Sequence, residues 1–218
     1  MRTCREARGL ALILTVTLAL WGTPEAWGGE PPGRIALRSH GVDSGLENAD
    51  VGSGIQDAEG FVWVITADAA YRFDGERFDR FGLDAGLPAL PVNDVGLDAR
   101  GRLLLATIKG VARFEGARFV AVPTPGVPPE VEFVRVDPRG RLLLSTAQGL
   151  FVEEPPGRFT LAPGWPGGPA GDIWLEPSGE LWVASDRHLA NRDARGQWHL
   201  REVPLARGPI AALARDGL

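Results

Sequence analysis

The stretch DPRGRLLLSTAQGLF (Asp137–Phe151) decides the fold of this chain. It joins an Asp-x-x-Gly turn to a run of three leucines, and a polar break ending in glycine leads to a second apolar run. Asp-x-x-Gly is typical of a hairpin turn, because the carboxylate caps turn amides and glycine adopts the positive φ that other residues resist. Leucines in succession, without alternation, indicate a strand covered on both faces. The stretch therefore predicts a buried β-hairpin.

The same pattern recurs along the chain at a regular interval. Four copies cover residues 53–78, 94–119, 133–159 and 172–198, and each reads as four short strands. Their first turn glycines are Gly60, Gly101, Gly140 and Gly179, and Gly217 opens a fifth copy, so consecutive copies lie 38 to 41 residues apart. Four antiparallel strands in about 40 residues is the size of one β-propeller blade. The sequence predicts an all-β propeller with four complete blades.

Both ends of this array look incomplete. Residues 34–51 align without gaps with 75–92, which makes residues 34–40 resemble the last strand of a blade, and the chain ends at Leu218 just after the first strand of the fifth copy. We expect an incomplete ring, with a lone closing strand in 29–40 and a partial propeller in 41–218. Two explanations are open: the chain is a fragment of a larger sensor, or it completes itself as a homo-oligomer through exposed blade edges.

The first 28 residues have the pattern of an export signal. Three arginines precede the apolar run Leu10–Trp21, and Gly22 and Pro24 follow it. This run is too short to span a bilayer comfortably, so we expect a signal helix that is cleaved before Gly29, with an uncleaved N-terminal anchor as the alternative. The protein is then exported, to the periplasmic or extracytoplasmic side of a bacterial inner membrane.

Composition argues against several kinds of partner and site. Removal of residues 1–28 leaves 20 basic and 26 acidic residues, which argues against a nucleic-acid partner or an anionic-membrane surface. The sole cysteine, Cys4, lies in the signal, so thiol chemistry is not expected. The three histidines (His40, His188 and His199) lack metal-ligand spacing, and turn capping explains the repeated Asp57, Asp98 and Asp137 better than a calcium site. We expect no metal, no cofactor and no catalytic residue.

The repeats resemble the two-component regulator propeller repeat family. Its pattern of Asp-x-x-Gly, Leu-Trp-apolar-small-Thr and x-x-Gly-Leu matches Asp57–Gly60 with Trp63 and Thr66. The stretch from Asp137 to Leu150 also matches, and DAGLPALPVNDV (84–95) is similar to the family's Gly-Leu-Pro connection. The chain departs from the pattern where leucine replaces tryptophan at 104 and 143, where Ile65 replaces a small residue, and where His188 replaces a glycine.

This resemblance implies a role in signal transduction. In the family the propeller is the extracytoplasmic sensor of a larger membrane receptor, a hybrid histidine kinase or sometimes a diguanylate cyclase, and it commonly takes carbohydrate-type ligands. The resemblance thus implies a chain that is not itself an enzyme. It would contact a membrane only through its signal or anchor, or through a C-terminal segment beyond Leu218.

The turns between the second and third strands of the blades carry the best candidates for ligand-binding residues. They vary from copy to copy, as variable loops on the binding face of repeat proteins do: Asp68, Lys109, Gln148 and the pair Arg187–His188. These side chains could line a site for a small polar or carbohydrate ligand; the alternative is that they are solvated hairpin tips. Trp165, in the long connection APGWPGGP (162–169), either stacks on a sugar or fills the seam between blades.

Two other classes of function stay open at this point. Some propellers of similar design are lyases that act on cyclic esters or glycans, and His188 is the only histidine suitably placed for such catalysis. A passive scaffold at the cell envelope is the third class, and it would show no stabilisation by small ligands.

Overall fold

The computed structural model describes residues 38–176, 178–185, 188–193, 195–203, 210 and 213. The chain divides into two units, 1–39 and 40–218, and only Arg38 and Ser39 of the first are described. The predicted signal (1–28), most of the predicted closing strand (29–40) and most of the fifth copy therefore lie outside the described residues. The described part of the closing strand, 38–40, is not in a strand.

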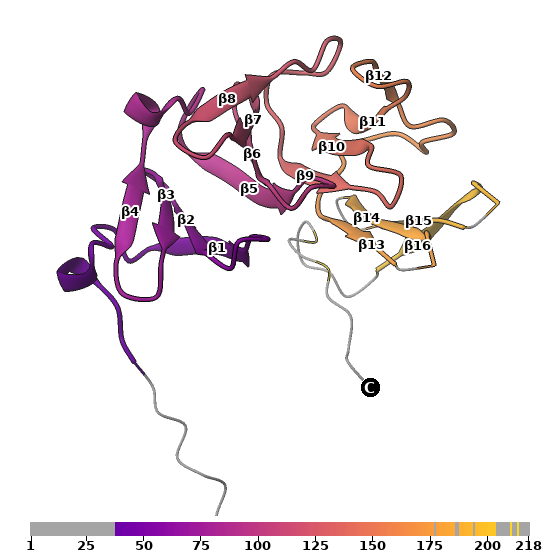
Figure 1. Ribbon diagram of the computed structural model, residues 1–218. Coiled ribbons are helices and arrows are strands. Elements are labelled where there is room, and N and C mark those ends of the chain that lie inside the picture. The colour runs from indigo at the N-terminus through magenta and orange to yellow at the C-terminus, as the bar shows by residue number, and fades with distance from the viewer. Residues whose placement is uncertain are drawn as a thin grey trace, which may run out of the picture. The chain divides into compact units, whose positions relative to one another are not determined.

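The second unit contains four four-stranded antiparallel sheets, which confirms the propeller blades (Figure 1). Blade 1 comprises β1 (Val51–Gln56), β2 (Val62–Thr66), β3 (Ala70–Phe73) and β4 (Phe78–Phe81); blade 2 comprises β5 (Val92–Leu97), β6 (Leu103–Thr107), β7 (Gly110–Phe114) and β8 (Phe119–Val122). Blade 3 comprises β9 (Phe133–Val136), β10 (Leu142–Thr146), β11 (Gly149–Glu153) and β12 (Phe159–Leu161); blade 4 comprises β13 (Ile173–Leu175), β14 (Leu181–Ser185), β15 (His188–Arg192) and β16 (Trp198–Glu202).

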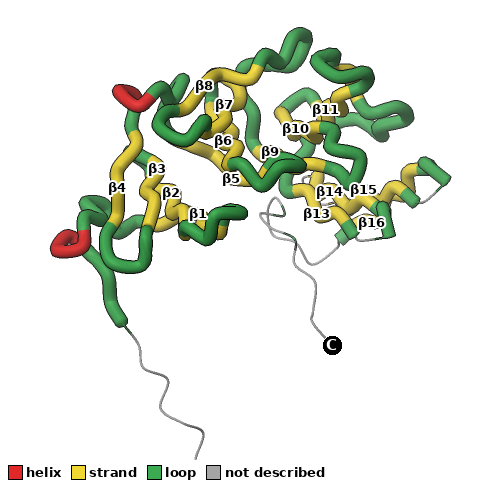
Figure 2. The backbone as a smooth tube through the Cα atoms, viewed as in Figure 1, coloured by secondary structure: helices red, strands yellow, loops and turns green. Residues whose placement is uncertain are grey.

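Each blade is a meander, because its strands pair in chain order. The first strands of consecutive blades contact one another, β1 with β5, β5 with β9, and β9 with β13. The described sheets form an open array and do not close a ring, as predicted for an incomplete propeller. Strands and loops make up nearly all of the described chain, apart from two one-turn 3₁₀ helices (Figure 2).

The second strand of a blade is apolar on both faces because two blades cover it. All five residues of β6 are buried. Leu103 and Leu105 pack with Trp63 of blade 1 in one hydrophobic cluster, whereas Leu104 packs with Leu144 of blade 3 in another. The run of leucines without alternation therefore marks a strand between two seams, as the sequence predicted.

Trp63 shows how strongly a seam is packed. Its ring is completely buried and makes edge contacts with Phe114 at 4.8 Å and Phe119 at 6.0 Å, both in blade 2. Trp182 holds the repeat-equivalent position in β14 but is only partly buried. Trp182 is more exposed than Trp63 because no described blade covers that face of blade 4.

The Asp-x-x-Gly turns cap themselves as predicted. Oδ1 of Asp98 accepts hydrogen bonds from the amides of Arg100 and Arg102, at 2.8 and 2.9 Å, and Gly101 has a φ of 77°. The carboxylate of Asp137 makes the same two bonds in blade 3, to Arg139 and Arg141. These bonds account for the repeated aspartates as turn caps.

The connections that enter blades 1 and 2 share one backbone geometry. The 3₁₀ helices η1 (Val42–Ser44) and η2 (Leu83–Ala85) both end at a glycine of positive φ, Gly45 at 91° and Gly86 at 93°. A Cβ on Gly86 would lie 2.3 Å from the carbonyl oxygen of Phe119, the first residue of β8. The connection therefore needs glycine both for its φ and for its close approach to the blade that follows.

Replacement of Gly86 tests the close contact between this connection and blade 2. We expect Gly86→Ala to lower the free energy of unfolding by about 3 kcal/mol, since the alanine suffers both the positive φ and the clash. Gly116→Ala is the matched control, because Gly116 has a φ of 83° but no atom within 4 Å of the added Cβ. It should cost only about 1 kcal/mol. Urea unfolding of both variants measures the difference, and equal losses would contradict the contact with Phe119.

Candidate functional site

The hairpin tips divide into two sets by topology. Since consecutive strands of a meander run antiparallel, the turns between second and third strands lie at one end of each blade, and the first-to-second and third-to-fourth turns lie at the other. With the four strands of a blade lettered A to D in chain order, we call the first end the B–C face and the other end the A–B face. The sequence-predicted ligand residues Asp68, Lys109 and Gln148 lie on the B–C face, and His188 begins the strand that follows its tip.

Two of these tips have a hydrogen-bonded backbone and an exposed side chain. Thr107 Oγ1 accepts a hydrogen bond from the amide of Lys109 at 3.1 Å and donates one to the carbonyl of Gly110 at 2.8 Å. Thr146 makes the same pair of bonds at the tip that carries Gln148. Lys109 and Gln148 are exposed, and their side chains have no polar partner among the described residues. The repeated threonine, whose role the sequence analysis left unexplained, fixes the turn that presents each of them.

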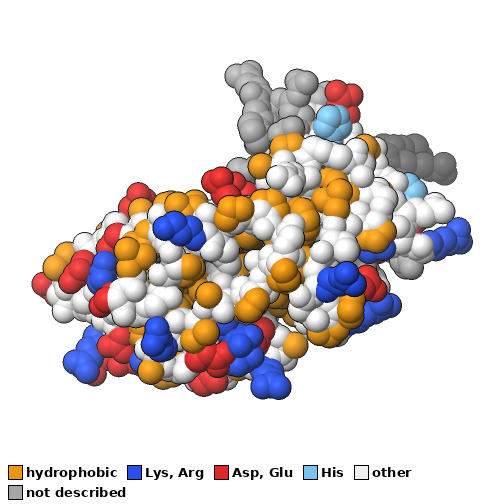
Figure 3. Space-filling view, turned by 90° about the horizontal axis from the view of Figure 1, so that it is seen from above, with side chains coloured by type: hydrophobic (Ala, Val, Ile, Leu, Met, Phe, Trp, Pro, Cys, Tyr) orange, Lys and Arg blue, Asp and Glu red, His pale blue; other side chains and the backbone are white. Residues whose placement is uncertain are grey.

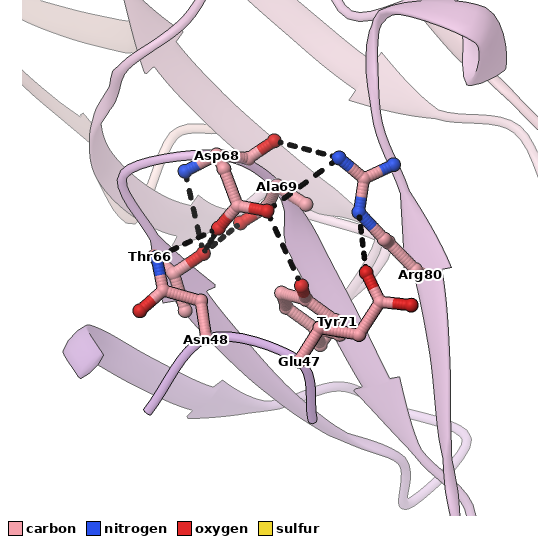
Figure 4. Close-up of polar contacts among 7 residues, drawn as sticks. All are labelled: Glu47, Asn48, Thr66, Asp68, Ala69, Tyr71 and Arg80. Carbon is pink, nitrogen blue, oxygen red and sulfur yellow. Dashed lines mark hydrogen bonds and ion pairs between the residues drawn. The ribbon is translucent and has the colours of Figure 1, made fainter. Parts of the chain in front are cut away.

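The carboxylate of Asp68, by contrast, is hydrogen-bonded by other residues of this chain (Figure 4). Its carboxylate accepts hydrogen bonds from Thr66, Asn48, Tyr71 and Arg80, at 2.7, 2.9, 3.4 and 3.5 Å. The hydrogen bond from Thr66 is the main cause that lowers the pKa of Asp68, with help from Asn48 and Arg80. Asp68 therefore joins the segment before β1 to blade 1, and little of its bonding capacity is left for a ligand.

Trp165 lies in the seam between blades 3 and 4. Its side chain is only 8% exposed, its ring meets Trp198 edge-on at 5.0 Å, and its indole N–H donates to the carbonyl of Gly168 at 3.1 Å. A Cβ on Gly149 would lie 2.7 Å from the indole nitrogen. This burial favours the seam-filling alternative over stacking on a sugar.

The last predicted tip is only partly described. Arg187 lies outside the described residues. His188 is exposed and pairs with Glu202 of β16 in the sheet. No hydrogen bond or ion pair joins any two of Asp68, Lys109, Gln148 and His188, and no group of three His, Cys, Asp or Glu residues in the described part of the chain could hold a metal ion.

The sequence analysis missed a buried ionic bridge on the first strands. Arg135 of β9 forms an ion pair with Asp94 of β5 and another, at 3.0 Å, with Asp172, the residue before β13. Both carboxylates are buried, and burial raises the pKa of Asp94 although Arg135 opposes the rise. Asp94 also accepts a hydrogen bond from the amide of Val134 at 2.9 Å. One guanidinium thus joins blades 2, 3 and 4; the signal in the sequence was an aspartate inside otherwise apolar strands.

The charged side chains of the described residues are of mixed sign on one face of the molecule. On the face drawn in Figure 3, Lys and Arg side chains are interspersed with Asp and Glu and form no continuous basic patch. In the described part of the chain, no helix is long and apolar enough to cross a bilayer.

The sequence matches no protein-family model and no curated protein. Solved structures share the fold. The extracellular domain of the putative one component system BT4673 from B. thetaiotaomicron is 19% identical, with a TM-score of 0.58 over 74% of this chain and 26% of that domain. The extracellular domain of the putative hybrid two component system BT3049 from the same organism is 19% identical, with a TM-score of 0.53 over 74% and 31%. This chain therefore spans about a quarter to a third of the sensor domains it resembles.

An enzyme shares the fold equally well. A catalytically inactive histidine variant of virginiamycin B lyase from Staphylococcus aureus, solved with quinupristin, is 14% identical, with a TM-score of 0.60 over 73% of this chain and 58% of the lyase. At such identities these likenesses establish the propeller fold alone.

Loss of the cation from the ionic bridge should destabilise the protein in a pH-dependent way. Arg135→Gln leaves two buried carboxylates unpaired, and we expect a loss of about 3 kcal/mol near pH 7.5. Because the pKa of Asp94 is raised on folding, its protonated form favours the native state, and this contribution is lost as pH rises through the folded pKa. The stability lost in Arg135→Gln should therefore be smaller near pH 4 than near pH 7.5.

Urea unfolding at both pH values measures this effect. Arg113→Gln is the control, because the pair of Arg113 with Glu115 is one-third exposed on both sides and should be worth less than about 1 kcal/mol. An Arg135→Gln cost no greater than the control's would contradict a bridging role.

Proposed function

We propose that this chain is the extracytoplasmic ligand-binding propeller of a signal-transduction receptor. The observation that carries the proposal is the repeated hairpin of the two-component regulator propeller type, which folds here into consecutive blades. The likeness to the extracellular domains of BT4673 and BT3049, proteins described as one component and hybrid two component systems, supports the same function. In this proposal the chain is exported, and the membrane and output parts of the receptor, a kinase or a cyclase, belong to sequence beyond the described residues.

The proposed ligand is a small polar molecule or carbohydrate bound on the B–C face. Lys109 would donate hydrogen bonds, and Gln148 would both donate and accept, from turns whose backbones Thr107 and Thr146 fix. Preorganised tips lose little entropy on binding, which favours their use as ligand contacts. His188 belongs to the proposed rim, and Arg187, which lies outside the described residues, is its further candidate. Asp68 contributes mainly by holding its own tip in place. Trp165 supports the seam below.

The signal would be a change in geometry and not a chemical reaction. A ligand that contacts tips of neighbouring blades stabilises one relative position of those blades, and it shifts the equilibrium by its difference in affinity for the two positions. Association of two copies through blade edges is a further part of the proposal and would carry that change to an output domain. Nucleic acid has no place in this scheme.

Ligand binding is tested by thermal unfolding of the whole chain with a panel of neutral mono- and disaccharides. A ligand at one hundred times its Kd stabilises a protein by about 2.7 kcal/mol, which raises the Tm of a chain of this size by roughly 5 °C or more. We expect such a shift with at least one saccharide. The double variant Lys109→Ala, Gln148→Ala should keep the Tm of the free protein and bind at least about 10-fold more weakly.

The control for the double variant is Arg77→Ala, an exposed cation on the opposite face. It should respond to the saccharide like the unaltered protein. Absence of any saccharide shift would contradict the proposed ligand, and an undiminished shift in the double variant would move the site away from the B–C face.

The alternative function is a lyase, favoured by the likeness to a lyase whose histidine variant is inactive. His188 is the exposed histidine nearest the B–C face, so it would have to supply the general acid or base. In the sensor proposal, the unaltered chain turns over no cyclic ester or glycan, and His188→Ala changes ligand affinity by a few-fold at most. A turnover that His188→Ala abolishes, while His199→Ala retains it, would replace the sensor proposal by the enzyme.

A further inference from the structure

The seam between blades 3 and 4 is built differently on the A–B face from the two seams before it. At the first seam, the amide of Ala58 donates to the carbonyl of Gly101 at 3.4 Å, and a Cβ on Gly101 would lie 2.4 Å from the Cβ of Ala58. At the second seam, a Cβ on Gly140 would lie 3.4 Å from that of Ala99. In both cases the alanine of one turn rests on the glycine of the next.

At the third seam this contact is missing. Pro138 replaces the alanine, and proline has no N–H to donate. A Cβ added to Gly179, the partner glycine, would meet no described atom within 4 Å. The turns stand apart, and a groove of about 440 Å³ opens between them. This volume lies in the range of small-molecule sites.

The groove has an apolar side and a polar side. Leu143 and Leu181, both buried, and the partly buried Leu175 form the apolar part of its lining. Arg139, Ser178 and Arg192 belong to the polar part. Such a lining suits a molecule that has a polar group beside an apolar ring face or chain.

The carboxylates of the groove are already used by the protein. Arg141 forms ion pairs with Asp137 at 2.7 Å and with Glu154 at 3.0 Å. Asp193 accepts hydrogen bonds from the turn amides of Arg195 and Gln197 at 2.9 Å and lies 3.0 Å from the ring of His199. These groups therefore leave little negative charge to balance another cation.

Two cations of the groove, by contrast, have no carboxylate partner among the described residues. In blades 2 and 3 the residue after the turn glycine is an arginine, which pairs with a glutamate of the third-to-fourth turn, as Arg102 does with Glu115 at 3.0 Å. Blade 4 has Glu180 after its turn glycine, so this pair is absent. Within the described part of the chain, the side chain of Arg192 donates only to the carbonyl of Gly196, at 3.3 Å, and the exposed side chain of Arg139 makes no polar contact.

We propose that this groove binds a small organic carboxylate, with the anion held by Arg139 and Arg192 and the ring or chain packed on the three leucines. Guanidinium groups bind carboxylates through charge-assisted and often bidentate hydrogen bonds, and a carboxylate would supply the partner that both arginines lack. The site lies on the face opposite to the B–C tips and takes a ligand of different charge, so it goes beyond the proposed sensor site.

The test compares ligands that differ mainly in charge, using the whole chain. Thermal unfolding and calorimetric titration are run with glucuronate against glucose, and with benzoate against benzamide. At least one carboxylate should raise the Tm. Any Tm response to its neutral counterpart should be the same in the groove variants as in the unaltered protein. Arg192→Gln and Arg139→Gln should each weaken carboxylate binding by about 10-fold, the loss expected for one charge-assisted hydrogen bond. The second variant guards against misfolding of the first, because the side chain of Arg139 is exposed.

Arg195→Gln is the matched control, an exposed arginine in the turn that follows Arg192 and one that does not line the groove. It should bind the carboxylate like the unaltered protein. The proposal is overturned if neither carboxylate stabilises the protein, or if both groove variants bind as tightly as the control. Carboxylate binding that the Lys109→Ala, Gln148→Ala variant abolishes also overturns it, whereas a missing response to neutral saccharides would count only against the B–C site.

Discussion

The packing of each four-stranded sheet against the next is the interaction on which the rest of this structure depends. A lone blade would expose both faces of its second strand, and the side chains of β6 show what its neighbours supply. Alternate leucines of that strand pack into two different hydrophobic clusters, one shared with blade 1 and the other with blade 3. At roughly 25 cal/mol for each Å² of apolar surface removed from water, these seams are the main source of stability.

Polar groups and glycines determine how closely neighbouring blades approach each other at a seam. Arg135 holds carboxylates from the blades on either side of its own, and Gly86 lets a connection touch the carbonyl of Phe119. These contacts act at defined points, so a seam can be tight at one end and open at the other. The exchange of an alanine for Pro138 at the third seam is such a local change. In repeat proteins, differences between repeats fall in loops on one face, which is often the binding face.

Much of this fold could be predicted from the sequence because its signals are local and repeated. The turn glycines, the aspartates that cap the turns and the buried runs of the second strands gave four blades in the right places. The alignment of 34–51 with 75–92, used here only for the closing strand, also covers η1 and η2, which share one geometry. The closing strand in 29–40 stays a prediction, because most of it lies outside the described residues.

The site could be predicted less well, because it depends on contacts between repeats. The sequence placed Lys109 and Gln148 at exposed tips, but it could not show that Asp68 is bound by Asn48, twenty residues earlier. It left two alternatives for Trp165, which only the burial of its ring separates. The ionic bridge and the groove require distances between blades, and those distances follow from packing and not from the pattern within one repeat.

Hydrogen exchange of the whole chain, with and without saturating ligand, tests most directly the claim that the seams of this propeller govern where it binds. The account predicts that a carboxylate which stabilises the protein slows exchange in peptides around Asp137–Arg141 and Arg192, at the open seam between blades 3 and 4. The turns Asp57–Gly60 and Asp98–Gly101, which belong only to the two closed seams, should keep their rates. Slower exchange at the closed seams, with no change around Asp137–Arg141, would contradict it.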